Sequence, residues 1–459
     1  MGSGEERSVR TGEPAPGAGA VAYIVSRFPK VTETFVLREV LRVRERGIPV
    51  ELHPLMLEKN AVEQPEVAAL RPDVRGGPLL HLGQVGPIVS FLLRHPLRTT
   101  ATVARALFSH RGTRRAFVGA LGTIPRAIEI AARLSRRSPD APPIAHVHAH
   151  FANNPALAAC IVGDLTGIPT SFTAHGSDIH RDQSGLAMKI ARTTRTVMIS
   201  DYNVDFVAER CGEETRERAV VIHCGIDTSV FTPRPAEREP GPFRILCVAA
   251  LRRVKGHAHL LEAVARLVEH GHDVRLELIG DGPLRDELTA LVETLGLGES
   301  VTFHGARPAP EVRAAMHRAD VLCLTSVIDA AGRREGIPVT LMEAMACALP
   351  VVASRISGIP ELIEHERSGL LATPGDAKAI ATELERLIAD PAWGRVLGET
   401  GRRKVQEEFE LDRCVEQLVT TCFRPSREAC ASRSSETERA RQAGPRAPLD
   451  RLEGNPSSS

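Results

Sequence analysis

The residues of this chain best placed to do chemistry are two glutamates, Glu335 and Glu343, with seven residues between them. Glu335 precedes a Gly-Ile-Pro loop, and Pro338 suits the first turn of a helix. Glu343 is the one charge in the apolar run 339–348, which predicts a mostly buried helix. The N-terminal end of a helix attracts anions, and a buried carboxylate there needs polar partners, for which the hydroxyl groups of a sugar or a ribose are suitable. The open alternative is an acid that only caps the helix.

The stretch EGIPVTLMEAMA, residues 335–346, resembles the signature of family 4 glycosyltransferases, which are retaining enzymes with the GT-B fold. This resemblance implies that Glu335 contacts the donor sugar and that Glu343 contacts the ribose of a nucleoside diphosphate. It also implies that the loop between them faces the sugar and the phosphates, through Gly336, Ile337, Pro338 and Val339. A Leu-Pro-Val-Val strand follows, as in the family, so the match is specific.

A second candidate group stands at the end of IPTSFTAH, a predicted strand that closes with His175. Ligands of open parallel sheets bind beyond the carboxyl ends of the strands, so His175 is well placed to meet one. The motif Thr-Ala-His-Gly-x-Asp is similar to that of the same family. The similarity implies that His175 donates a hydrogen bond to an anomeric or phosphate oxygen and that Asp178 faces the acceptor. A loop histidine with partners inside the protein is the alternative.

Three histidines alternate along one face of the predicted strand IAHVHAHF: His146, His148 and His150. Such a face can suggest a metal site, but no cysteine or acid stands beside them at ligand spacing in the sequence. We therefore interpret them as strand residues of the family type, and we predict neither a metal site nor a cofactor.

The sequence LRRVKGH places Lys255 at a predicted turn between a strand and its helix. A cation there can hold a leaving diphosphate and stabilise the charge that develops as a glycosidic bond breaks. The family has an Arg and a Lys at this turn; Lys255 matches the Lys, whereas the Arg position falls on Ala250. Arg252 or Arg253 could supply the missing cation, with Arg252 ranked slightly ahead. A solvated loop lysine is the alternative for Lys255.

The N-terminal stretch SRFPKVTETFVLREV, residues 26–40, closely resembles the start of the exopolysaccharide, colanic-acid-type branch of family 4. Many members carry a glycine pair in this loop, where this chain has Lys-Val-Thr-Glu, so Thr32 and Glu33 are predicted at the acceptor edge. A helix start with a capping threonine is an equally open interpretation. The strand, helix, strand order over residues 20–57 predicts a parallel doubly wound sheet.

Residues 60–140 form an insert with a basic helical segment, in which Glu129 is the one acid between positions 81 and 138. Apolar residues are interleaved with the arginines, as in a basic amphipathic helix pair that binds an anionic membrane surface or a lipid-phosphate acceptor. The alternative is a solvated basic face on helices that pack against the N-terminal sheet. The arginines of the segment are Arg94, Arg98, Arg105, Arg111, Arg114, Arg115, Arg126, Arg133, Arg136 and Arg137.

Length and composition are those of a globular protein with more than one domain. The chain has 459 residues, of which 42% are hydrophobic and 25% charged, and a formal net charge of +1, so nucleic acid is not predicted as a partner. Nine scattered cysteines without C-x-x-C spacing indicate reduced thiols rather than zinc or disulfides. No apolar run is long enough to cross a bilayer. The expected location is the cytoplasm, with contact to the inner face of the membrane through residues 90–137 as an open alternative.

The expected fold is α/β of the GT-B type, in which two Rossmann-like domains with doubly wound parallel sheets face a cleft. The expected divisions are a disordered tail at 1–18, an N-terminal acceptor domain at 19–235 that contains the insert, a C-terminal donor domain at 240–424 whose last helix crosses back, and a disordered tail at 425–459.

The resemblance implies a retaining glycosyltransferase that moves a sugar from a nucleoside-diphosphate sugar to a hydroxyl acceptor. The first expected acceptor is a lipid-linked or exopolysaccharide intermediate, and the second is a secondary metabolite. Two other classes fit parts of the pattern. A glycoside hydrolase also uses paired carboxylates, but both must face one anomeric centre, which Glu343 on a helix behind a loop fits poorly. A non-catalytic protein that binds nucleotide sugars would be consistent with the displaced arginine.

Overall fold

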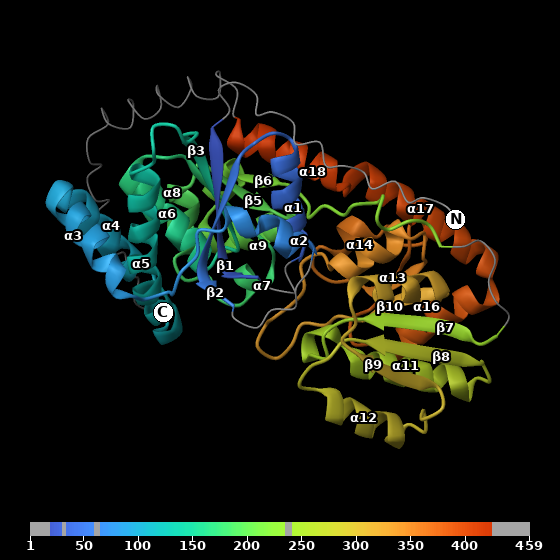
Figure 1. The fold of residues 1–459 in the computed structure, drawn as a ribbon. Helices are drawn as coiled ribbons and strands as arrows, with labels where there is room; N and C mark the ends of the chain where they lie inside the picture. Colours follow the sequence, from blue (N-terminus) through green and yellow to red (C-terminus); the bar gives the residue numbers. More distant parts are fainter. Residues whose placement is uncertain (1–18, 30–33, 59–64, 235–240, 425–459) are drawn as a thin grey trace, which may run out of the picture.

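The computed structural model describes residues 19–29, 34–58, 65–234 and 241–424, which form two lobes (Figure 1). The expected tails at 1–18 and 425–459 lie outside the described residues. Thr32 and Glu33, at the predicted acceptor edge, also lie outside them. Within these ranges no helix is both long enough and apolar enough to cross a membrane.

The N-terminal lobe is built on a six-stranded sheet in the order β2-β1-β3-β4-β5-β6, and every pair of neighbours is parallel. Parallel neighbours need a crossover connection, which is why helices alternate with these strands along the chain. The strands are β1 (Ala20–Phe28), β2 (Val50–Leu57), β3 (Ile144–His150), β4 (Thr170–Ala174), β5 (Arg195–Met198) and β6 (Ala219–Val221). Apart from the helices of the insert's basic segment, the helices are α1 (Thr34–Glu45), α2 (Pro65–Leu70), α6 (Asn154–Thr166), α7 (Ser177–His180), α8 (Leu186–Arg192), α9 (Asp201–Cys211) and α10 (Glu214–Arg218).

The C-terminal lobe repeats the design with a parallel sheet in the order β12-β11-β10-β7-β8-β9. Its strands are β7 (Phe243–Val248), β8 (Val274–Ile279), β9 (Val301–Gly305), β10 (Val321–Leu324), β11 (Val351–Ser354) and β12 (Leu370–Ala372). Its helices are α11 (His257–Glu269), α12 (Arg285–Thr294), α13 (Ala309–Arg318), α14 (Val339–Ala346), α15 (Ile359–Leu362), α16 (Ala377–Ala389) and α17 (Pro391–Glu408).

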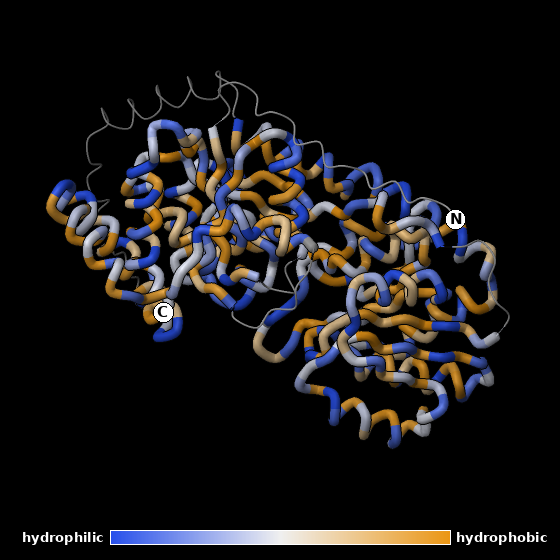
Figure 2. The backbone as a smooth tube through the Cα atoms, viewed as in Figure 1, coloured by the Kyte–Doolittle hydropathy of each residue, from blue (hydrophilic) through white to orange (hydrophobic). Residues whose placement is uncertain are grey.

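The cores of both lobes lie between these sheets and the helices that cover them. Every residue of β4, β10 and β11 is buried, as expected for parallel strands covered on both faces. Figure 2 shows the hydrophobic residues following the strands of both lobes. The prediction of two Rossmann-like domains of the GT-B type is confirmed.

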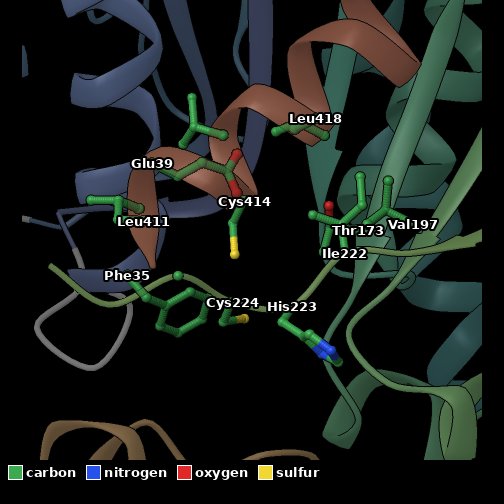
Figure 3. Close-up of a pocket in the computed structure, with 12 residues that line it drawn as sticks. Phe35, Glu39, Thr173, Val197, Ile222, His223, Cys224, Leu411, Cys414 and Leu418 are labelled. Atoms are coloured by element: carbon green, nitrogen blue, oxygen red, sulfur yellow. The ribbon is translucent and has the colours of Figure 1, made fainter. Parts of the chain in front are cut away.

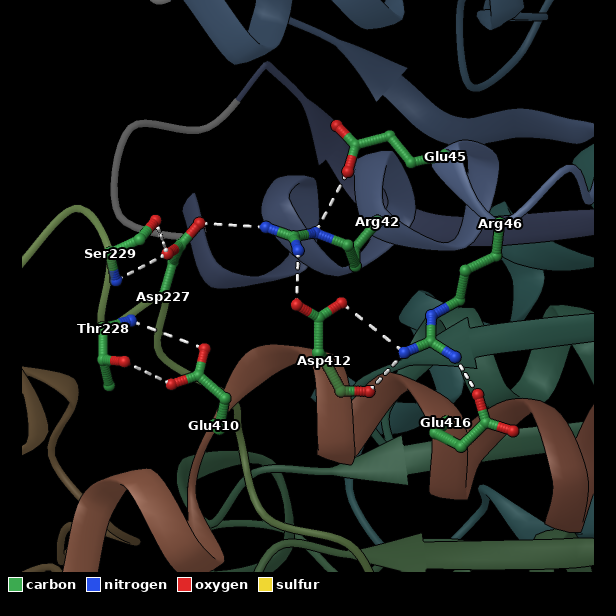
Figure 4. Close-up of polar contacts among 9 residues, drawn as sticks. All are labelled: Arg42, Glu45, Arg46, Asp227, Thr228, Ser229, Glu410, Asp412 and Glu416. Atoms are coloured by element: carbon green, nitrogen blue, oxygen red, sulfur yellow. Dashed lines mark hydrogen bonds and ion pairs between the residues drawn. The ribbon is translucent and has the colours of Figure 1, made fainter. Parts of the chain in front are cut away.

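The chain returns to the N-terminal lobe through α17 and then α18 (Leu411–Leu418), which run along both lobes in Figure 1. The buried face of α18 packs with β1 and α1 in one apolar cluster. Arg42 of α1 contacts Asp412 of α18 at 2.6 Å (Figure 4). It also contacts Asp227 at 2.9 Å, in the linker between the lobes that runs from β6 to β7. Arg46 adds a contact to Glu416, so two guanidinium groups on one helix hold the crossover in place.

The basic segment of the insert contains three α-helices rather than the expected pair: α3 (Val85–Arg94), α4 (Pro96–Ser109) and α5 (Arg114–Ser135). The extra boundary has a local cause, because Pro96 at the start of α4 cannot continue the preceding helix. In Figure 1 these helices stand at the outer end of the N-terminal lobe, with α5 between the others and the sheet.

The backbones of the two lobes come into contact where the chain after β10 meets the chain after β4. A Cβ atom on Gly336 would lie 2.3 Å from the carbonyl oxygen of His175, and one on Gly176 would lie 3.0 Å from the amide nitrogen of Gly336. Gly176 also has φ +123°, a conformation that favours glycine. The backbones therefore touch because neither position carries a side chain.

Gly336→Ala should open this contact, since the new methyl group would collide with backbone that has no freedom to rotate away. Overpacking of this kind costs about 1–3 kcal/mol, so we expect a lower Tm and a larger radius of gyration in small-angle scattering. Gly298→Ala is the matched control, because a Cβ there meets nothing within 4 Å. A Gly336→Ala protein with the scattering curve and Tm of the control would show that the lobes do not rest on this contact.

Candidate active site

An open cavity of about 1290 Å³ lies between the lobes at the carboxyl edges of their sheets. In the C-terminal sheet β7 and β10 are neighbours, but β7 leads outward to β8 and β10 leads to β11 on the opposite side. This is a topological switch point, where open α/β sheets leave a crevice that binds ligands. Lys255 follows β7 and Glu335 follows β10, so the switch point brings together two residues that are far apart in the sequence.

Lys255 and Glu335 form an ion pair, with Nζ 2.7 Å from Oε2 and side chains that are 17% and 18% exposed. The geometry of the turn depends on Gly256, where φ is +67° and a Cβ would lie 1.9 Å from the carbonyl oxygen of Thr325. Glu335 lines the cavity. The pair therefore offers a cation for a phosphate oxygen beside a carboxylate that can accept hydrogen bonds from hydroxyl groups.

Gly336 and Ile337 leave Glu335 along the wall of the C-terminal lobe. Their backbone N–H groups have no acceptor within the part of the chain that the structure describes. Pro338 then stands at the N-cap of α14, and Val339 begins that helix. The loop thus joins free N–H donors to the positive end of a helix, which is an arrangement suited to anionic or hydroxyl ligands.

Glu343 lies in α14 and faces the N-terminal lobe. Its Oε1 is 3.8 Å from Nη1 of Arg38 in α1, and its side chain is 17% exposed. Burial raises the pKa of Glu343 to about 7, and the Arg38 guanidinium acts in the opposite direction. The carboxylate is therefore largely desolvated and only partly compensated, which leaves it able to accept hydrogen bonds from a ligand.

His175 lies where the two lobes meet, but its ring turns into the N-terminal lobe. Its Nε2 is 3.1 Å from Nδ1 of His150, and its Nδ1 is 3.5 Å from Sγ of Cys224. What His175 presents to the other lobe is its backbone carbonyl, which abuts Gly336. The hydrogen bond to an anomeric or phosphate oxygen that the sequence suggested would require the ring to leave both partners.

Asp178 is buried and lines the cavity, but its carboxylate accepts hydrogen bonds from the backbone N–H groups of Ala152, His175 and Gly176. Burial raises the pKa of Asp178, and these N–H donors act in the opposite direction. In this structure Asp178 therefore shapes the turn that carries His175, and its predicted contact with an acceptor would use an already occupied carboxylate.

The two candidates for the missing arginine differ in their surroundings. Arg253 contacts Glu287, with Nη2 3.1 Å from Oε2. The side chain of Arg252 is exposed, lines the cavity, and has no partner among the described residues. Ala250 is exposed at the same turn and offers no charge. Arg252 is thus the cation that is free to meet an anionic ligand.

Some contacts between the lobes were not predicted from the sequence. Glu361 of α15 accepts hydrogen bonds from the backbone N–H groups of Asp201 and Tyr202, at 2.9 and 2.8 Å, and so caps α9 of the opposite lobe. Arg334, next to Glu335, donates to the hydroxyl group of Tyr202 at 2.6 Å. A glutamate in a Gly-Ile-Pro-Glu turn carries no local signal that its partner is a distant helix end.

The histidine strand does acquire an acid in the fold, because α1 brings Glu39 to it. The ligand atoms of Glu39, His148 and His150 lie within 4.8 Å of one another, which is close enough for a metal ion. However, His148 contacts Ser171 and Thr173 at 2.7 and 3.0 Å, and His150 contacts His175 and Glu39. Hydrogen bonds thus account for these ring nitrogens, and the geometry gives no reason to add a metal.

Two different protein families match this chain, one in each half. The family described as glycosyltransferase family 4 matches residues 94–230, and the family described as glycosyl transferases group 1 matches residues 231–404. Among solved structures, the Anabaena protein Alr3699/HepE in complex with UDP superposes with a TM-score of 0.65 at 17% identity, over 88% of this chain and 99% of that chain. At this identity the superposition shows the shared fold alone.

Two curated relatives are more similar in sequence. The putative colanic acid biosynthesis glycosyltransferase WcaL of Escherichia coli is 43% identical over 169 residues, which is 37% of this chain but only 42% of that relative. The amylovoran biosynthesis glycosyltransferase AmsK of Erwinia amylovora is 30% identical over 417 residues, or 87% of this chain and 98% of that relative. A match of that length, together with the two sheets and the cleft between them, shows that the chain is a glycosyltransferase and belongs to family 4, in the branch of these exopolysaccharide-type enzymes.

Proposed function

We propose that this glycosyltransferase moves a sugar from a nucleoside-diphosphate sugar to a hydroxyl acceptor with retention at the anomeric carbon. The observation that carries the proposal is the Lys255–Glu335 pair at the switch point, with N–H groups of the same loop free beside it. A phosphate oxygen on Lys255 and a sugar hydroxyl on Glu335 would satisfy both members of the pair. The Anabaena structural neighbour was solved with UDP, which supports a nucleotide donor.

In the proposed reaction, the acceptor hydroxyl attacks the anomeric carbon as its bond to the diphosphate oxygen breaks. A new carbon–oxygen bond forms, and the proton of the hydroxyl passes to the departing phosphate. Lys255 and Arg252 stabilise the negative charge that gathers on the diphosphate, while Glu335 and the loop after it hold the sugar. Catalysis is then positioning and electrostatic stabilisation, with no group of the protein covalently changed.

Substitutions at the two glutamates should separate sugar handling from nucleotide binding. Glu335→Ala should lower turnover by about a hundredfold or more, because the reacting sugar loses its orienting carboxylate. Glu343→Ala should mainly raise the donor KM. The measurement is release of nucleoside diphosphate from UDP-, GDP-, ADP- and TDP-sugars, with and without a polyprenyl-diphosphate-linked saccharide as acceptor.

The control for this assay is Glu399→Ala, an exposed glutamate on α17. Full turnover in Glu335→Ala would refute the proposed site. Transfer to a soluble natural-product acceptor but not to the lipid-linked saccharide would keep the chemistry and reassign the acceptor to a secondary metabolite.

Donor affinity should rise with pH, because burial raises the pKa of Glu343 to about 7 and only the ionised form accepts hydrogen bonds at both oxygens. Glu343 is mostly protonated about one unit below that pKa and mostly ionised about one unit above it, so a Kd for the preferred nucleotide sugar should fall severalfold across this interval. The diester diphosphate of a nucleotide sugar does not titrate there. Glu343→Gln should remove the pH dependence; an unchanged slope in that variant would assign it to another group.

We further propose that the insert docks on an anionic membrane surface from which the acceptor is taken. Most exposed large hydrophobic residues of the described chain lie here: Leu80, Leu82, Val85, Val89, Leu92, Leu93, Leu97, Phe108, Phe117, Val118 and Leu121. The arginines divide into two groups. Six have partners inside the protein: Arg98, Arg105, Arg126, Arg133, Arg136 and Arg137.

The remaining arginines lie among the exposed apolar side chains. Arg94, Arg114 and Arg115 have no side-chain partner in the described residues, and Arg111 lies over the ring of Phe108, with its Cζ 3.7 Å from the centroid. Glu129, the one acid between positions 81 and 138, is bound by Arg126 at 2.7 Å. Arg115 and Val118 also line the cavity, which connects this surface to the cleft. An apolar and cationic surface of this kind fits anionic lipid.

Charge reversal at Arg94, Arg111 and Arg114 should weaken binding to vesicles that contain anionic phospholipid by about tenfold or more, since each cation near such a surface contributes about 1 kcal/mol. Co-sedimentation measures the effect. The control reverses three exposed arginines of the other lobe, Arg266, Arg318 and Arg395. Arg115 is left intact because it lines the cavity. Equal losses in both triple variants, or none in the first, would count against docking through the insert.

A further inference from the structure

A line of buried polar side chains leads from the edge of the cleft into the N-terminal lobe. It begins at His175, whose Nε2 is 3.1 Å from Nδ1 of His150. His150 continues it, with Nε2 3.1 Å from Oε1 of Glu39. The hydroxyl group of Tyr23 donates to the same oxygen at 3.2 Å. Four elements contribute one member each: the end of β4, the end of β3, α1 and β1. Figure 3 shows Glu39 in this interior, above Phe35 and Cys224.

The carboxylate at one end fixes where the protons lie. The Oε1 atom of Glu39 accepts from the hydroxyl group of Tyr23, and it accepts from Nε2 of His150 in the same way. With its proton on Nε2, His150 has a bare Nδ1, which accepts from Nε2 of His175. Burial lowers the pKa of His175 well below its usual value, so His175 carries a single proton. Its Nδ1 is left to accept from the thiol of Cys224, whose pKa burial raises well above the usual value.

The ring packing around this line leaves His175 one orientation. Its ring stacks on that of His150, with centroids 5.3 Å apart and planes at 22°. Phe35 and Phe151 pack against it from other sides, at 4.9 and 4.7 Å between centroids. Because the ring is fixed, so is the backbone of the turn, whose carbonyl lies against Gly336 and therefore next to Glu335.

We propose that Glu39 and His150 are positioning residues for glycosyl transfer, which hold His175 as the Nε2–H tautomer and thereby fix the His175–Gly176 turn against the loop that carries Glu335. This inference rests on the proposed function of that loop. Neither residue touches the substrate; each acts through His175. The sequence does not mark Glu39, which stands on a helix after an apparent cap, and it marks His150 only as one of three alternating strand histidines.

The test uses the full chain with Glu39→Leu, which removes the acceptor, and Glu39→Gln, which keeps an acceptor oxygen at nearly the same place. Glu39→Leu should lower kcat about tenfold or more with little change in the donor KM, because the reacting groups are displaced while the nucleotide site is intact. Glu39→Gln should restore most of that loss. The assay follows release of UDP from UDP-glucose with octyl glucoside as acceptor.

A second measurement does not depend on activity. Nitrogen chemical shifts of histidine-labelled protein should show His175 with a protonated Nε2 and a bare Nδ1 in the wild type and in Glu39→Gln, and a different pattern in Glu39→Leu. His146→Leu is the matched control: His146 is buried on the same strand and contacts Ser171 at 2.7 Å, but it has no contact with His175. This variant should leave both the His175 pattern and kcat unchanged. A Tm measurement on the same protein shows whether the substitution has altered its stability.

Three outcomes would overturn the inference. One is a His175 that carries its proton on Nδ1, or a doubly protonated His150, since either reverses the chain of hydrogen bonds. Another is a Glu39→Leu protein with the kcat of the wild type. The third is an equal loss in His146→Leu and Glu39→Leu, which would mean general damage to the lobe. A wild type that releases no UDP from UDP-glucose would count against this donor and leave the tautomer measurement to decide the inference.

Discussion

The contact on which the site depends is between two stretches of backbone, one from each lobe. Gly336 lies against the carbonyl oxygen of His175, so close that a side chain at this position would collide with it. Each stretch comes directly after a strand of a parallel sheet, and the carboxyl ends of such strands are where crevices form. The carboxyl edges of the two sheets meet here with no side chain between them. This contact places Glu335, the His175 turn and the free N–H groups of the loop at one point. Glycine is therefore required here for distance rather than for flexibility.

Helix α1 connects that point to the rest of the molecule. Successive residues on it serve different partners: Arg38 faces Glu343 of the opposite lobe, and Glu39 turns inward to His150. One turn further along, Arg42 binds the linker and α18, which is the segment by which the C-terminal half crosses back (Figure 4). A displacement of α1 would therefore shift the partners of Glu343, of the buried histidines and of the crossover together. Partly buried charge pairs of this kind contribute more to a defined geometry than to net stability.

The sequence was a sufficient guide to the fold and to residues whose position follows from strand order. Alternation of apolar strands with amphipathic helices predicts parallel sheets, and parallel sheets place Lys255 and Glu335 at strand ends. It was a poor guide to where side chains point. The ring of His175 turns inward because its hydrogen-bond partners, His150 and Cys224, lie inside the N-terminal lobe. Asp178 binds its own turn because three backbone N–H groups converge on its carboxylate. Arg38, Glu39 and Glu361 read as ordinary surface charges, since their partners come from segments far away in the chain.

The ion pair between Lys255 and Glu335 has a chemical consequence for the proposed binding of the donor. Lys255 and Glu335 are each mostly covered, yet still partly exposed, at 17% and 18%. An ion pair in such a place is worth little in net free energy, because desolvation offsets most of the attraction. Under the proposed function, a diphosphate would bring two charges to Lys255 and a sugar would bring hydroxyl donors to Glu335, so each member of the pair would exchange its partner for one that bonds at least as well. The ion pair thus keeps both side chains ordered and their charges compensated before a donor binds. Separating the two side chains then costs little free energy. A site held in this way needs little reorganisation at the moment of transfer, which is the condition under which fixed charges stabilise a developing leaving group most effectively.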